Sequence, residues 1–234
     1  MTTTHDFTSL YDARALEYAL AVVFLALFVV LWRALEAPPR EAVAVRRAGW
    51  FSLPEGVRLH PGHAWARLEA DGLVSVGLDD FGHKLIGPLR DVQLPVPGTA
   101  LGQGRPAFRL AADGASLPVL APVSGVVAQV NELGRRAPGR LHADPYGTGW
   151  LLKLRPHRGL QANLKQLLSG ELARLHMERA AERLAASLTP ELGALAADGG
   201  APVHGFAREL DPDGWERLAR QFLLTDDVKD GGES

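Results

Sequence analysis

The stretch that decides the fold reads Ala121-Pro122-Val123-Ser124-Gly125-Val126-Val127-Ala128-Gln129-Val130. A proline and a glycine precede an apolar run of strand length, which is typical of a short β-strand entered from a tight corner. Similar short runs occur at residues 74–78 and 91–94, and turn sequences occur at residues 95–98 and at Asp113-Gly114. The pattern predicts that residues 51–156 form a mainly β domain of many short strands.

Four motifs in this region occur in the same order as in one known family. They are His63-Ala64-Trp65, the segment from Val76 to Gly82, Ala121-Pro122-Val123-Ser124-Gly125 continuing to Val130-Asn131-Glu132, and Asp144-Pro145-Tyr146-Gly147-Thr148-Gly149-Trp150-Leu151. Together they resemble the glycine cleavage H protein family, over residues 56–155. The resemblance implies a lipoyl-domain-like flattened barrel or sandwich, and a domain shape that several enzymes recognise.

The same resemblance directs attention to a lysine that this chain lacks. The family attaches lipoate to a lysine at the tip of the hairpin before the Ala-Pro-Val-Ser-Gly motif. Counting back from Pro122 without a gap places that position on Gly114, and no lysine occurs between Lys84 and Lys153. Asp113-Gly114 is instead typical of a two-residue type I′ turn. Since lipoate needs a lysine amine, we expect neither a lipoyl arm nor another cofactor.

The composition excludes several other classes of site. The chain has 234 residues and a formal net charge of -2 with both signs mixed along it, which argues against nucleic acid as a partner. Cysteine is absent, so disulfides, thiolate nucleophiles and Cys-type metal sites are excluded. His60 and His63 lie near Glu69 and Asp71, but an intervening turn and the lack of an evident third ligand argue against a metal site. No nucleophile elbow, phosphate-binding loop or dinucleotide motif occurs, so we expect no catalytic residues.

An apolar run near the N-terminus, residues 15–35, has no charge between Tyr18 and Trp32. About 20 helical residues cover the hydrocarbon layer of a bilayer, so the length predicts a single-pass transmembrane helix. Tyr18, Trp32 and Arg33 are placed as its interfacial anchors. A cleaved signal peptide is the weaker alternative, because the run lacks a basic leader and a small-x-small cleavage site. The basic residues after the run place residues 1–14 outside and the remainder in the cytoplasm, at the inner (plasma) membrane.

The rest of the chain divides into a linker, a helical extension and a tail. Residues 36–50 read as a proline-containing linker. From Leu160 to Leu188, apolar residues recur at spacings of three and four, as on one face of an amphipathic helix. We expect the helical extension to cover residues 157–225 and a frayed acidic tail to follow at residues 226–234.

Two further short helices are expected within this extension. Thr189-Pro190 and Asp211-Pro212 are helix-start signals, with proline at the first helical position. The last helix contains Trp215, Phe222 and Leu223, which are candidate partner-binding anchors. These aromatic and leucine side chains can equally be core residues.

These expectations combine into a non-enzymatic function. The sequence favours a membrane-anchored, non-lipoylated H-protein-like subunit that acts as a scaffold or docking module in a larger membrane complex, with an electron-transfer complex as one host. The alternative is a functional lipoyl-carrier H protein in glycine cleavage or a related sulfur or one-carbon pathway. A hydrolase or transferase is a third hypothesis, and it requires a cleft with converging ionisable groups.

Overall fold

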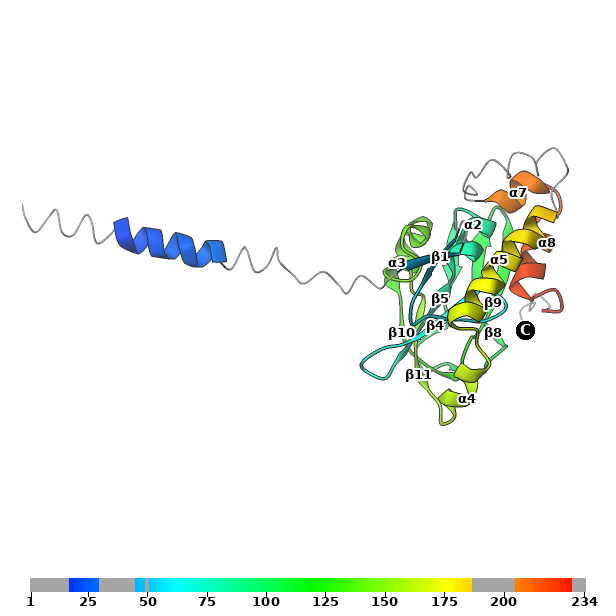
Figure 1. Cartoon of the computed structure of the whole chain (residues 1–234), viewed down its shortest axis with the longest axis horizontal. Coiled ribbons are helices and arrows are strands. Elements are labelled where there is room, and N and C mark those ends of the chain that lie inside the picture. The colour runs from blue at the N-terminus through cyan, green and yellow to red at the C-terminus, as the bar shows by residue number, and fades with distance from the viewer. Residues whose placement is uncertain (1–16, 30–44, 49–50, 187–204, 229–234) are drawn as a thin grey trace, which may run out of the picture. The chain divides into compact units, whose positions relative to one another are not determined.

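The computed structural model describes residues 17–29, 45–48, 51–186 and 205–228, and Figure 1 shows the chain. The chain divides into two compact units, residues 1–43 and 44–234. The first unit contains a helix of residues 17–29. The second contains all the described strands and the other described helices.

The helix of the first unit corrects the prediction of a membrane span. The part of this helix that the structure describes covers residues 17–29, which is about 20 Å at 1.5 Å per residue. Among the described residues, no helix has both the length and the apolar character needed to cross a bilayer. The predicted transmembrane helix over residues 15–35 is therefore wrong, and with it the membrane partner, the single-pass orientation and the inner-membrane location. Tyr18 lies exposed on the described helix, whereas Trp32 and Arg33 lie outside the described residues.

The second unit is built from antiparallel sheets. The largest sheet has the order β3-β4-β5-β11-β10-β7, and its strands are β3 (Arg58–Leu59), β4 (Ala64–Leu68), β5 (Val74–Leu78), β7 (Ala100–Leu101), β10 (Gly125–Val130) and β11 (Leu152–Pro156). A second sheet has the order β6-β8-β9, with β6 (Asp91–Gln93), β8 (Pro106–Ala112) and β9 (Ala115–Leu120). Strand β1 (Val45–Ala48) pairs with β2 (Phe51–Pro54). The prediction of a mainly β domain is confirmed.

A buried tryptophan fixes the packing of β4 against β5. Trp65 is fully buried, and its indole Nε1 donates a hydrogen bond to the carbonyl of Leu78 at 3.1 Å. Gly77 is paired with Trp65 across the two strands. A Cβ at Gly77 would lie 2.7 Å from Trp65 Nε1, so the close approach of the ring requires glycine there. The motif residues at these positions therefore act as structural core.

The remaining motifs form corners of the domain. Asn131 accepts a hydrogen bond from the N–H of Leu133 at the start of α3 (Glu132–Arg136), and its amide donates to the carbonyl of Thr148 at 2.8 Å. The carboxylate of Asp144 accepts from the backbone N–H groups of Gly147 and Thr148 at 2.9 and 2.7 Å. A short 3-10 helix, η1 (Pro138–Ala143), lies between these two turns. Side-chain acceptors thus hold the chain where it leaves regular structure.

The other helices lie at the ends of strands and in the C-terminal extension. They are α2 (Asp80–Ile86), α4 (Leu160–Lys165), α5 (Gly170–Ala186), α7 (Phe206–Leu210) and α8 (Trp215–Leu223). The continuous helical pattern from Leu160 to Leu188 is interrupted because Leu168 exchanges two backbone hydrogen bonds of 2.8 Å with Leu59 of β3. Edge pairing therefore breaks the helix between α4 and α5. The helix start predicted at Thr189-Pro190 lies outside the described residues.

Candidate functional site

The β8–β9 hairpin is the candidate site, because it is the place where the family resemblance puts a functional group. Leu110 pairs with Leu117, and Ala112 pairs with Ala115, so the connecting turn contains two residues. Asp113 has φ 42° and Gly114 has φ 85°. Positive φ at both positions defines a type I′ turn, whose twist matches that of the strands. The two-residue turn predicted from the Asp-Gly sequence is confirmed.

The tip of the hairpin is exposed, but its aspartate is engaged by two arginines. A Cβ on Gly114 would meet no atom within 4 Å, so the tip faces open space. The Asp113 carboxylate pairs with the Nε of Arg90 at 3.3 Å and with the guanidinium of Arg208. Arg90 is 76% exposed, whereas Arg208 is 23% exposed. The better-buried of the two partners comes from α7 in the C-terminal extension.

None of the described lysines lies at this hairpin tip. Lys84 on α2 pairs with the Asp80 carboxylate at 2.9 Å and lies over the Phe51 ring at 5.2 Å. Lys153 lies within β11, with its ammonium 5.2 Å from the centre of the Trp150 ring. Lys165 ends α4. The only other lysine of the sequence, Lys229, lies outside the described residues.

A buried histidine–aspartate pair lies where α5 meets the β domain. His63 Nδ1 lies 2.8 Å from the Asp79 carboxylate, and both side chains are fully buried. The other oxygen of Asp79 accepts from the backbone N–H of Gly82 at 2.7 Å, which starts α2. The ring of His63 stacks on Phe81 at 4.3 Å and lies 5.1 Å from the ring of His176. Among the described residues, no hydrogen-bond partner meets Nε2 of His63 or of His176.

The protonation state of His176 follows from this enclosure. Burial, with a smaller contribution from the nearby His63, lowers the pKa of His176 to about 4, although Asp79 opposes the shift. Burial also lowers the pKa of His60, again with a contribution from His63. His60 and His176 are thus held in their neutral form near pH 7.

This histidine cluster does not form a metal centre among the described residues. Within the described ranges, no three His, Asp or Glu side chains are placed to hold a metal ion. His60 uses its Nδ1 to accept a hydrogen bond from the N–H of Gly62 at 3.0 Å. The chain has no cysteine, and aromatic rings of Phe81 and Phe222 pack around His63. The His63–Asp79 pair is therefore part of the packing between the β domain and α5.

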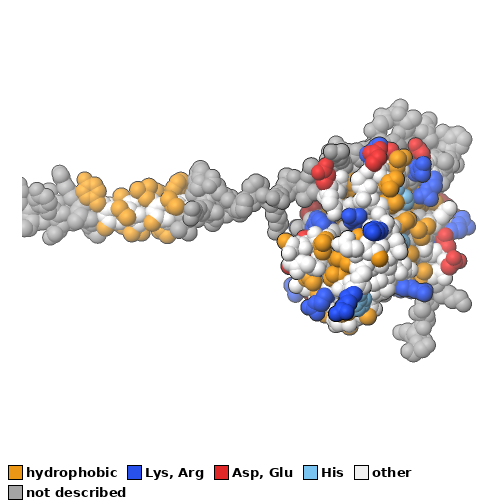
Figure 2. Space-filling model, turned by 60° about the horizontal axis from the view of Figure 1, so that its bottom comes forward, with side chains coloured by type: hydrophobic (Ala, Val, Ile, Leu, Met, Phe, Trp, Pro, Cys, Tyr) orange, Lys and Arg blue, Asp and Glu red, His pale blue; other side chains and the backbone are white. Residues whose placement is uncertain are grey.

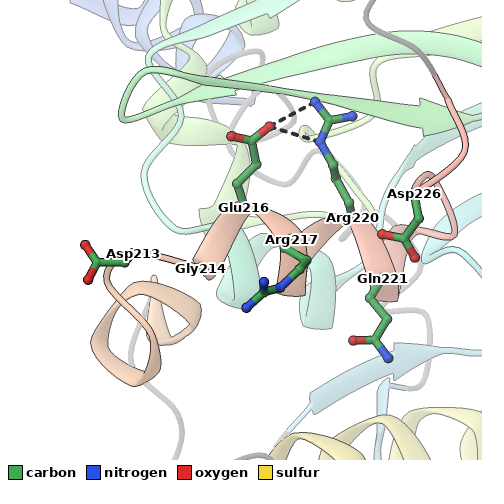
Figure 3. Close-up of a pocket in the computed structure, with 7 residues that line it drawn as sticks. All are labelled: Asp213, Gly214, Glu216, Arg217, Arg220, Gln221 and Asp226. Carbon is green, nitrogen blue, oxygen red and sulfur yellow. Dashed lines mark hydrogen bonds and ion pairs between the residues drawn. The ribbon is translucent and has the colours of Figure 1, made fainter.

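A surface hollow lies on α8 (Figure 3). Its lining residues are Asp213, Gly214, Glu216, Arg217, Arg220, Gln221 and Asp226. Arg220 is already paired with the Glu216 carboxylate at 2.9 Å, as the dashed lines show. Arg217 is 84% exposed, and the hollow opens broadly to solvent. Figure 2 likewise shows basic and acidic side chains intermingled with neutral ones on the face in view. The hollow thus lacks the buried, converging groups that a hydrolase or transferase requires.

The candidate partner-binding residues of the last helix are buried within this chain. Trp215, Phe222 and Leu223 are 7%, 5% and 0% exposed. The Phe222 ring lies 5.1 Å from the ring of Phe81, and the guanidinium of Arg208 lies over the Trp215 ring at 5.4 Å. While α8 stays docked, these side chains offer little surface to another protein.

Sequence reasoning missed the two arginines that hold the hairpin, Arg208 and Arg220. Arg220 donates to the carbonyl of Ser116 at 3.0 Å, across 104 positions of sequence. It also missed the pairing of His63 with Asp79. The only local signal at Asp79 was its position before a helix, since an aspartate there is a common N-cap.

Comparisons with known proteins agree with the motif order. The family model described as the glycine cleavage H-protein matches residues 57–180. A protein of Pyrococcus horikoshii named as a probable glycine cleavage system H protein is 36% identical over 123 residues, which cover 53% of this chain and 90% of that protein. One of Thermococcus gammatolerans with the same name is 35% identical over 130 residues, covering 56% of this chain and 96% of its own.

One solved structure is also similar to this chain. The crystal structure of a glycine cleavage system H protein from Mycobacterium marinum covers 55% of this chain and 99% of its own, with 25% identity and a TM-score of 0.48. The family match ends within α5, so helices α7 and α8 lie beyond it.

Proposed function

Because the chain belongs to the glycine cleavage H-protein family, we propose that it acts as a non-enzymatic docking subunit of a glycine cleavage-type system, without lipoate on its β8–β9 hairpin. The domain spans almost the whole length of the relatives, which supports retention of the shape that their partner enzymes recognise. This docking function takes the place of the membrane-scaffold function that the sequence favoured.

The hairpin tip is the observation on which the proposal depends. A lipoyl arm is joined by an amide to a lysine amine, and the tip offers Asp113 and Gly114 instead. Glycine has no side chain to acylate. The type I′ geometry, with positive φ at both residues, closes the hairpin tightly around this sequence.

Competition with an authentic H protein tests the docking function. The full chain is titrated into a glycine cleavage reaction that uses a purified, lipoylated H protein from one of the relatives. We expect inhibition that extra lipoylated H protein reverses, because both domains bind the same enzymes. A matched control chain with Trp65→Ala, which removes the buried core ring, should not inhibit. Undiminished turnover at a large excess of the intact chain would overturn the docking function.

The second candidate is a lipoyl carrier, as the names of the relatives suggest. Its arm would have to be attached to one of the four lysines, Lys84, Lys153, Lys165 or Lys229. Intact-mass measurement of the chain from cells supplied with lipoate and a lipoate ligase separates the two candidates. We expect the unmodified mass. A mass increase equal to one lipoyl group establishes the carrier, and peptide mapping then identifies the lysine.

A further inference from the structure

The C-terminal helices α7 and α8, here named the C-terminal cover (residues 205–228), pack against the hairpin. Helix α8 lies against β9, as can be followed in Figure 1. Arg220 of α8 donates through Nη2 to the carbonyl of Ser116 on β9, at 3.0 Å. Its Nε is held by the Glu216 carboxylate at 3.0 Å, which orients the guanidinium. The flank of β9 is thereby bound through its backbone.

Helix α7 binds the tip of the same hairpin. Arg208 pairs with the Asp113 carboxylate, and its guanidinium also lies over the Trp215 ring at 5.4 Å. Its Nη2 donates to the carbonyl of Ile86 at 3.4 Å, at the end of α2. One side chain therefore connects the hairpin tip, α2 and α8.

The seating of the cover depends on two glycines and on buried apolar side chains. The N–H of Gly205 donates to the carbonyl of Lys84 at 2.7 Å. A Cβ on Gly87 would lie 2.6 Å from the Cα of Gly205, so the two backbones touch where α2 ends and α7 begins. The buried apolar residues that belong to the cover are Phe206, Ala207, Trp215, Ala219, Phe222 and Leu223.

The tip and its flanks differ in accessibility. Asp113 and Gly114 are exposed, whereas Ala112 and Ala115, the residues on either side, are 1% and 8% exposed. A small reagent can therefore reach Gly114, but a protein-sized molecule that grips the hairpin also has to contact the cover. The hairpin surface proposed for docking is then partly covered by α7 and α8 of the same chain.

We propose that the C-terminal cover is an autoinhibitory contact, which occupies the hairpin flank in cis and restricts docking of a partner enzyme at the hairpin until α7 and α8 are released. The proposal rests on the docking function only for the identity of the outside partner. The contact itself is a property of this chain, and the helices that make it, α7 and α8, lie outside the residues that match the family.

Because the chain has no cysteine, a single introduced thiol can be labelled to test whether the cover shields the hairpin. Gly114→Cys in the full chain introduces one thiol at the open tip, and its labelling rate is measured with a small maleimide and with a large polymer-linked maleimide. We expect the small reagent to react readily and the large one to react slowly. Adding Arg208→Ala and Arg220→Ala should raise the large-reagent rate by about tenfold, because two charge-assisted contacts that close the cover are lost.

Arg90→Ala is the matched control, because Arg90 pairs with the same Asp113 carboxylate but is not part of the cover. We expect this variant to leave the large-reagent rate unchanged. Equal labelling rates with the large reagent in the parent, the double variant and the control would contradict the proposal that the cover shields the hairpin. Circular dichroism checks that each variant is folded, and Arg208→Lys with Arg220→Lys, which keep the charges, should restore much of the protection.

A second measurement separates this proposal from the docking function. In the competition assay, the double variant without Gly114→Cys should inhibit at lower concentration than the parent. If neither protein inhibits, the docking function fails, while the labelling rates still decide whether the cover shields the hairpin. If both inhibit equally although the labelling rates differ, the cover is present but is not autoinhibitory.

Discussion

At the scale of single residues, the seam between α5 and the β domain depends on neutral histidine. The groups that face His176 are His63, Asp79 and Arg183, together with the carbonyl of Pro61. Protonated His176 would place a second cation near Arg183 inside a partly desolvated contact. The neutral imidazole is therefore the form that the folded state accepts.

This geometry predicts that acid weakens the fold through His176. Its pKa is about 4 in the folded chain and about 6.5 in the unfolded chain, so folding favours the neutral form. The contribution is fully present above pH 6.5 and is lost as the pH falls from 6.5 to 4. The loss amounts to at most about 3 kcal/mol at and below pH 4. Urea unfolding at pH 7 and at pH 4.5 measures it.

His176→Gln is the matched variant, because the amide keeps a polar side chain of similar reach and cannot be protonated in this range. The difference in unfolding free energy between pH 7 and pH 4.5 should shrink in this variant. An unchanged pH dependence would show that His176 is not the group responsible.

At the scale of elements, the contact between α2 and α7 requires glycine at its centre. Gly87→Ala introduces a Cβ that would lie 2.6 Å from the Cα of Gly205, and the residue also has φ 85°. We expect a loss of about 2 to 4 kcal/mol, from backbone strain plus displacement of α7. Thermal or urea unfolding measures the loss.

Gly98→Ala separates the two causes. Gly98 has φ 94°, but a Cβ there meets no atom within 4 Å. Only the strain of about 1 kcal/mol is then expected. Equal losses at Gly87 and Gly98 would mean that the close approach of α7 contributes nothing.

Local sequence patterns predicted those structural elements that interactions between neighbouring residues determine. The turn at Asp113-Gly114 follows from residue type and spacing, and it occurs in the structure. The pattern from Leu160 to Leu188 was interrupted by the pairing of Leu168 with Leu59, which no helical periodicity reveals. The length of the apolar run over residues 15–35 predicted a transmembrane helix, whereas the helix that the structure describes there covers residues 17–29.

The candidate site was predicted only in part for a similar reason. The hairpin and its lack of lysine could be read from motif order. The ion pair of Arg208 with Asp113 joins residues far apart in sequence, and Arg208 belongs to no motif. The buried anchors Trp215, Phe222 and Leu223 have the same composition as an exposed docking helix, so only the packed structure shows where they lie.

At the scale of the whole β-containing unit, the extension and the sheets share one core. Phe81 of α2 lies 5.1 Å from the ring of Phe51 and 5.1 Å from the ring of Phe222. It also lies 6.0 Å from the ring of Phe206. Helices α7 and α8 therefore contact the aromatic cluster that also packs β2, and the extension is not a separate domain.

This shared core predicts that release of α8 is costly but still leaves β9 paired with β8. In native-state hydrogen exchange, the slowest amides of α8 should report a smaller opening free energy than those of β9, although α8 cannot leave without exposing Phe222 and Phe81. Phe222→Ala should lower both values by about 3 to 5 kcal/mol, as expected for a buried ring. Arg217→Ala on the same helix removes a side chain that is 84% exposed, and it should change both by less than about 0.5 kcal/mol. Equal opening free energies for α8 and β9 in the parent chain would contradict this, since the cover would then open only together with the hairpin strand.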